Sequence, residues 1–116
     1  MVKSLVIAVD FDGTIVAHKY PKIGAEIPFA FSTLRELQKQ GHRLILWTYR
    51  SGSYLQDAVD YCAENGIIFY AVNKNFPEEI YVDGEVSRKI YADFYIDDRN
   101  IGGLLSWSDI WQLLNK

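Results

Sequence analysis

Short runs of consecutive apolar residues recur along the chain, and such a run is typical of a strand that is buried on both faces. Four runs predict strands, at residues 5–9, 42–47, 67–72 and 92–96. Three other segments space their apolar residues three or four positions apart and predict helices, at residues 28–40, 53–65 and 106–114. Because strands alternate with helices, residues 1–116 are expected to form one doubly wound, Rossmann-like α/β domain around a parallel sheet flanked by helices.

Two segments interrupt this alternation. Residues 16–27 mix polar and apolar side chains without a clear period and are predicted to form a loop. In the second segment, Asp83-Gly84 is a dipeptide that favours a two-residue turn, and residues 79–82 and 85–88 flank it. A small β-hairpin insertion is therefore predicted at residues 79–90.

Carboxylates follow directly after the first and the last predicted strands. Asp10 and Asp12 end the first strand, and Asp97 and Asp98 end the last. Ligands of open parallel sheets bind beyond the carboxyl ends of the strands, so these acids are expected at one site. Carboxylate oxygens suit Mg²⁺, which keeps several waters and binds substrate phosphates. The alternative, that each acid pair only forms a turn or a cap, is disfavoured by their joint placement.

The sequence Asp10-Phe11-Asp12-Gly13-Thr14 resembles the first motif of the haloacid dehalogenase-like superfamily of phosphohydrolases. Thr48 is similar to its second motif, Lys89 to its third and Asp97-Asp98 to its fourth, in the order that the superfamily keeps. The first motif is a specific signal, whereas the threonine and the lysine gain weight only from their positions. The resemblance covers most of the chain and implies a Mg²⁺-dependent phosphomonoester hydrolase.

By this resemblance, Asp10 is the nucleophile that forms an aspartyl-phosphate, and Asp12 is the general acid and base. Asp10 and Asp97 would bind Mg²⁺ through their side chains, and Asp12 through its backbone carbonyl. Asp98 would contact the metal directly, act through water, or orient Lys89.

Three further polar residues are candidates for binding the phosphate. Thr48 would donate its hydroxyl proton to a phosphoryl oxygen, and Lys89 would neutralise the phosphoryl charge. Arg88 is the alternative to Lys89, because the two are adjacent and alternate in the expected strand. Arg50 is a candidate for substrate contact, weighed equally against a solvated loop charge.

Composition narrows the class of protein. With 116 residues, of which 49% are hydrophobic, the chain fits a single core. A formal net charge of −3 disfavours nucleic acid as a partner.

The single cysteine, Cys62, cannot form an intrachain disulfide and is expected to pack inertly on a helix. No apolar run is long enough to cross a membrane and the start shows no signal peptide, so a cytoplasmic location is expected.

The substrate and several functional alternatives stay open. Larger members of the superfamily enclose the substrate with a cap domain, but the segments at 16–27 and 73–90 are too short for one. The open site fits a phosphorylated macromolecule, or a small phosphate ester covered by a second subunit of a homo-oligomer. Its expected rim is His18, Lys19, Tyr20, Lys22 and residues 73–76. The alternatives are a phosphotransferase, a phosphate- or protein-binding relative without activity, and a response-regulator-type phosphoacceptor. The last would need an aspartate where the third strand ends at Val72-Asn73.

Overall fold

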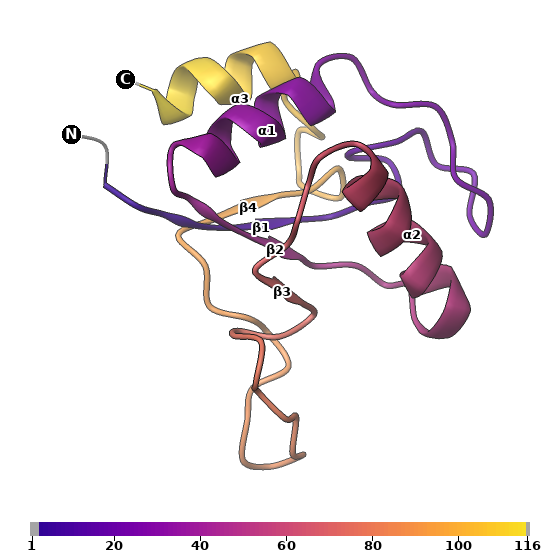
Figure 1. Cartoon of the computed structure of the whole chain (residues 1–116), viewed down its shortest axis with the longest axis vertical. Coiled ribbons are helices and arrows are strands. Elements are labelled where there is room, and N and C mark those ends of the chain that lie inside the picture. Colours follow the sequence, from indigo (N-terminus) through magenta and orange to yellow (C-terminus); the bar gives the residue numbers. More distant parts are fainter. Residues whose placement is uncertain (1–2, 116) are drawn as a thin grey trace.

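The computed structural model describes residues 3–115, which form one parallel sheet and three helices (Figure 1). The strands, in the order β3-β2-β1-β4 across the sheet, leave β1 and β2 in its interior. The elements in chain order are β1 (Val6–Val9), α1 (Ala30–Lys39), β2 (Arg43–Leu46), α2 (Gly52–Glu64), β3 (Ala71–Val72), β4 (Phe94–Ile96) and α3 (Trp107–Leu114). The predicted Rossmann-like α/β class is confirmed.

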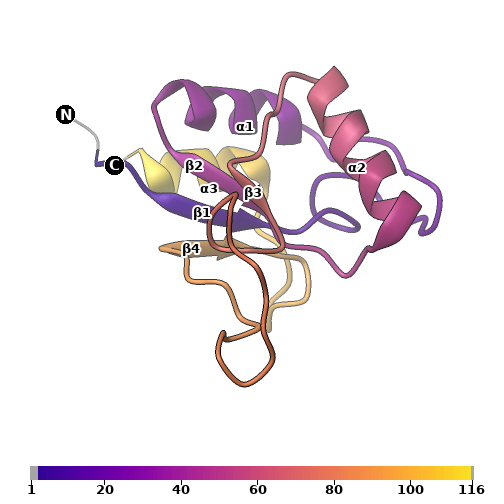
Figure 2. The same cartoon turned by 60° about the horizontal axis from the view of Figure 1, so that its bottom comes forward.

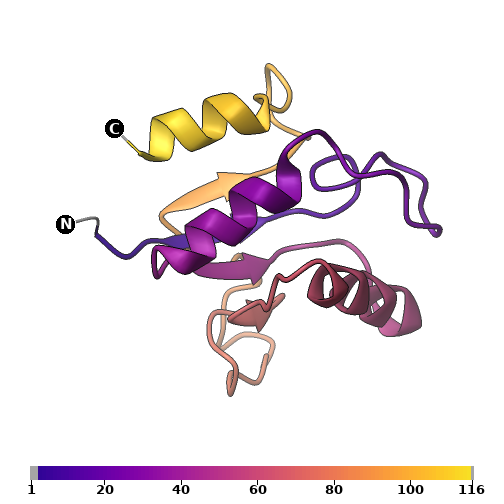
Figure 3. The same cartoon turned by 45° about the horizontal axis from the view of Figure 1, so that its top comes forward.

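The two faces of the sheet are covered differently. Alternate strand residues such as Ile7, Val9 and Leu46 pack into one core cluster with residues of α1, α2 and α3. Figure 3 shows α1 and α3 side by side over the sheet, with α2 at its β3 edge. On the other face, Ala8 and Ile45 pack against Ile90, which lies in the connection between β3 and β4. Figure 2 shows this connection in front of the sheet, where a doubly wound domain usually has a helix.

Most boundaries differ from the prediction by one or two residues, and β3 and α2 show local reasons for the difference. β3 is shorter than the predicted strand 67–72 because the first of these residues bond elsewhere. The Ile67 amide donates to the Cys62 carbonyl and the Ile68 amide to Oε1 of Gln38. α2 begins earlier than predicted, with Ser51 rather than Ser53 as its N-cap.

The predicted β-hairpin at residues 79–90 is wrong in its strands, although its turn forms. The amides of Glu85 and Val86 donate to the Val82 carbonyl, but no strand is assigned between residues 73 and 93. An isolated two-stranded ribbon is marginally stable without a face to bury, and the Ile80 side chain is 78% exposed. The side chain of Asn75 instead ties the ends of the segment together, by bonds to Glu79 and to the amide of Tyr91.

The expectations for the cysteine and for membrane crossing can be compared with the structure. Cys62 is fully buried in the helix-side core, and burial raises the pKa of its thiol to about 12, which agrees with inert packing. Within residues 3–115, none of the helices has the length and apolar character needed to cross a membrane.

Candidate active site

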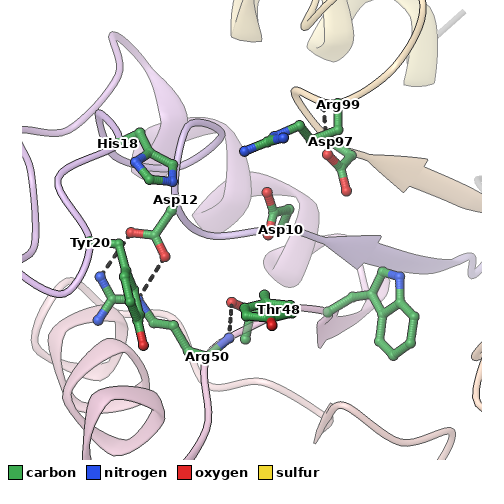
Figure 4. A pocket seen from close by; sticks show the side chains of 10 residues that line it. Asp10, Asp12, His18, Tyr20, Thr48, Arg50, Asp97 and Arg99 are labelled. Carbon is green, nitrogen blue, oxygen red and sulfur yellow. Dashed lines mark hydrogen bonds and ion pairs between the residues drawn. The ribbon is translucent and has the colours of Figure 1, made fainter.

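The carboxyl ends of three strands converge on one pocket of about 630 Å³ (Figure 4). Asp10 directly follows β1, Asp97 directly follows β4, and Thr48 lies just past the end of β2. Because parallel strands end at the same edge of the sheet, this convergence follows from the topology. The pocket is lined by Asp10, Asp12, His18, Tyr20, Trp47, Thr48, Tyr49, Arg50, Asp97 and Arg99.

Three carboxylates meet at this edge and form what we call the acid triad: Asp10, Asp97 and Asp98. One oxygen from each lies within 4.8 Å of the others. Burial, reinforced by the neighbouring acids, raises the pKa of Asp10 from 3.8 to about 7, although the backbone amide of Phe11 acts in the opposite direction. Three hard oxygen donors whose mutual repulsion a cation would relieve fit a divalent ion such as Mg²⁺.

Thr14 connects two members of the acid triad. Its hydroxyl lies 3.3 Å from Oδ2 of Asp10 and 3.4 Å from Oδ1 of Asp98, and it accepts a 3.0 Å bond from the Asp98 amide. The Thr14 carbonyl in turn accepts a 2.9 Å bond from Nε1 of Trp107, at the start of α3. The sequence motif included Thr14 without a role. Here Thr14 couples the loop after β1 to the loop after β4.

Gly13 allows Asp98 to approach the loop after β1. Its φ is +82°, a left-handed conformation that L side chains rarely adopt, and a Cβ at this position would collide with the Asp98 carboxylate. The compact turn around it is closed by bonds from the Ile15 amide to the Phe11 carbonyl and from the Gly13 amide to the Val16 carbonyl. The glycine of the motif is therefore required by the geometry of the acid triad.

Asp12 lies on a different wall of the pocket from the acid triad. Both of its carboxylate oxygens accept hydrogen bonds from Arg50, at 2.7 and 2.8 Å. The Asp12 side chain is 12% exposed, and that of Arg50 is fully buried. The bond to Asp12 raises the pKa of Arg50, which stays charged. The expected metal contact through the Asp12 carbonyl stays a prediction.

Thr48 lines the pocket, and its backbone is fixed from the neighbouring strand. Its amide donates a 2.8 Å bond to Oδ1 of Asn73, which directly follows β3 and has a φ of +55°. The Thr48 hydroxyl oxygen accepts a 3.2 Å bond from the Arg50 amide, so its proton is free to be donated into the pocket. Sequence reasoning named Asn73 only as a rim residue, yet its side chain holds Thr48.

The structure does not bring Lys89 or Arg88 into the pocket. The ammonium of Lys89 lies 5.2 Å from the centre of the Tyr95 ring, and the guanidinium of Arg88 lies 4.7 Å from that of Tyr81. Without the predicted hairpin strands, no ladder directs these side chains toward Asp10. The cation that reaches the pocket from the β4 side is Arg99, which sequence reasoning missed and which Figure 4 shows beside Asp97.

The rim of the pocket is only partly as predicted. His18 and Tyr20, from the loop between β1 and α1, line it as expected, whereas Lys19, Lys22 and residues 73–76 are not among its lining residues. Trp47 and Tyr49, on either side of Thr48, complete the aromatic part of the wall. The sequence feature that could have identified these two residues is their position at the carboxyl end of the second predicted strand.

Comparison with known proteins identifies a relative but no activity. The fold and the acid-lined edge define a parallel α/β protein with a candidate cation site. A solved relative is a conserved protein of Bacteroides thetaiotaomicron, with 51% sequence identity and a TM-score of 0.91 over 97% of this chain and 91% of that one. The chain belongs to the same family as this protein. No family model matches the chain, and no curated protein matches it.

Proposed function

We propose that this protein is a Mg²⁺-dependent phosphomonoester hydrolase, a capless member of the haloacid dehalogenase-like superfamily. The observation that carries the proposal is the separation of two acidic functions across one pocket. Asp10 lies in the acid triad, whereas Asp12, two residues later, is held apart by Arg50. One position suits a nucleophile beside a cation, and the other suits a group that handles the proton of the leaving oxygen.

Residues of the acid triad would hold the metal. Asp10, Asp97 and Asp98 supply oxygen donors from the ends of β1 and β4, and Thr14 keeps two of them in register. When bound, Mg²⁺ would offset the charge of the phosphate and of the nucleophile that attacks it. Asp98 lies close enough to the other two acids to be a metal ligand itself. This favours direct metal contact over the other two roles expected for Asp98, which were contact through water and orientation of Lys89.

The reaction takes place in two steps. An oxygen of Asp10 attacks phosphorus in line with the ester oxygen, so that the new O–P bond forms while the P–O bond to the alcohol breaks. Asp12, which has taken up a proton from solvent, donates it to the departing oxygen. Asp12 then takes a proton from water, which attacks phosphorus and releases inorganic phosphate and the Asp10 carboxylate. Thr48 donates its hydroxyl proton to a phosphoryl oxygen in both steps.

Arg50 and Arg99 both line the pocket, but Arg50 is paired with Asp12, so Arg99 takes the charge-neutralising role first expected of Lys89. The open wall of His18, Tyr20 and Tyr49 offers planar side chains to the part of the substrate beyond the phosphate. Water is the expected acceptor at such a site. The cytoplasmic location predicted from the sequence agrees with a phosphorylated metabolite as substrate and stays a prediction.

The test is phosphate release from a panel of phosphorylated metabolites and phosphopeptides, with Mg²⁺ or with a chelator. Asp10→Asn serves as the blank, because an amide of the same shape is a far weaker nucleophile. Release that requires Mg²⁺ and is lost in Asp10→Asn supports the proposal. Full activity in Asp10→Asn would refute it, whereas a stable phosphorylated Asp10 without release would indicate a phosphotransferase or a phosphoacceptor domain.

A further inference from the structure

Arg50 has no hydrogen-bond donor left for a ligand. A guanidinium carries five N–H donors, and each has a partner within the chain. Two bond Asp12, as described above, and the others bond the carbonyls of Pro21 at 3.2 Å, Tyr54 at 3.1 Å and Lys22 at 3.0 Å. A direct bond to substrate, which the sequence had allowed, would require one of these bonds to break.

Two aromatic rings hold the guanidinium in place. Its central carbon lies 5.0 Å from the centre of the Phe11 ring and 5.2 Å from that of Tyr20, and the residue is only 2% exposed. Phe11 lies between the two catalytic candidates of the first motif, and Tyr20 lines the pocket. Arg50 therefore joins the loop after β1 to the rim loop at residues 20–22, and Figure 4 shows it beneath Tyr20 and Asp12.

The orientation of Asp12 follows from this arrangement. A carboxylate whose two oxygens both accept bonds from one planar guanidinium is fixed in direction as well as in distance. Arg50 itself cannot turn without losing its three bonds to backbone carbonyls. The carboxylate is thereby kept on the rim side of the pocket, away from the acid triad.

We propose that Arg50 is the positioning residue of Asp12, setting the direction from which Asp12 delivers a proton to the leaving oxygen. The inference rests on the function proposed above for Asp12. Through the carbonyls of Pro21, Lys22 and Tyr54, the same residue ties that direction to the rim loop and to the first turns of α2.

The test uses two substrates that differ in their need for a proton, an alkyl phosphate and 4-nitrophenyl phosphate. An alkoxide leaves poorly unless it is protonated, whereas nitrophenolate leaves without help. Asp12→Asn should lower kcat/KM, which reports the step in which the leaving group departs, by at least about a hundredfold on the alkyl ester and far less on the aryl ester. Arg50→Ala should show the same selectivity, with a loss about tenfold greater on the alkyl ester than on the aryl ester.

Two further variants and one control separate a positioning role from general damage to the fold. The double variant Asp12→Asn/Arg50→Ala should be no slower on the alkyl ester than Asp12→Asn, because Arg50 acts through Asp12. Arg50→Lys keeps the positive charge but loses the paired N–H donors of the guanidinium. It should therefore be more active than Arg50→Ala, less active than the wild type, and still favour the aryl ester. Arg35→Ala is the matched control, since that exposed arginine bonds the Asn65 carbonyl and does not line the pocket, and it should leave both rates unchanged.

Equal losses on both esters in Arg50→Ala and Arg50→Lys would overturn the proposal. It would also be overturned if the loss in the double variant equalled the product of the losses in Asp12→Asn and Arg50→Ala. Hydrogen exchange at the Arg50 Nε–H, followed by NMR, tests the positioning without turnover. This proton should exchange slowly in the wild type and faster in Asp12→Asn. Absence of phosphate release from any wild-type reaction would refute the proposed hydrolase alone, whereas fast wild-type exchange, or exchange unaffected by Asp12→Asn, would overturn the positioning role.

Discussion

Removing one charge from the acid triad should stabilise the metal-free protein. Burial, together with Asp97 and Asp98, raises the pKa of Asp10 from 3.8 to about 7, so the folded state keeps a proton that the unfolded chain releases. Between these two values the folded state binds more protons, and the free energy of unfolding therefore falls as the pH rises. Above about pH 7 the stability associated with the proton on Asp10 is lost. Asp10→Asn, which cannot ionise, should not show this fall.

The size of the effect can be worked from the same values. Each pKa unit corresponds to about 1.4 kcal/mol, so the rise from 3.8 to about 7 sets a ceiling of about 4 kcal/mol over the whole window. Asp10 is only half-buried and solvent screens its neighbours, which reduces the expected fall between pH 5 and pH 8 to about 1 kcal/mol. In a domain of 116 residues, that corresponds to about 4 °C in Tm.

The assay is thermal unfolding in a chelator at several pH values from 5 to 8, for the wild type, Asp10→Asn and Asp60→Asn. Asp60 is the control because it is an exposed acid on α2, far from the acid triad in the sequence. The wild type and Asp60→Asn should lose stability relative to Asp10→Asn as the pH rises. Mg²⁺ should raise the wild-type Tm more at pH 8 than at pH 5.5, because cation and proton compete for Asp10. If the Tm of the wild type and the Tm of Asp10→Asn changed in parallel with pH, the raised pKa of Asp10 in the acid triad would be refuted.

Three other substitutions test the supports of the site. Gly13→Ala should cost about 1–3 kcal/mol in urea unfolding and weaken the Mg²⁺-induced rise in Tm, because its Cβ would meet the Asp98 carboxylate at a positive φ; an unchanged Mg²⁺ response would contradict this. Trp107→Phe keeps an aromatic ring but loses the bond to Thr14, and should lower the free energy of unfolding by about 1–3 kcal/mol. Arg99→Ala should raise KM for a phosphate ester about tenfold or more, and Lys89→Ala less; the reverse order would mean that the 73–93 segment rearranges when substrate binds.

The acids of the site could be predicted from the sequence because their positions depend on local patterns and on topology. An apolar run followed by a carboxylate places that carboxylate at the end of a strand, and parallel strands bring their ends to one edge. Asp10, Asp97 and Thr48 lie where this reasoning puts them. Lys89 does not, because its placement depended on a hairpin whose strands have no apolar face to bury.

The residues that hold these acids in place were out of reach of the sequence patterns, since each acts across a long separation. Arg50 bonds Asp12 across 38 positions, and Trp107 bonds Thr14 across 93. No periodicity relates such pairs; the only local signal was that Arg50 closely follows a strand ending at the same edge as Asp12. A carboxylate at a strand end has several rotamers, and in this protein one guanidinium selects among them. The reactive groups are thus specified by short motifs, whereas their directions are specified by the packing of distant segments.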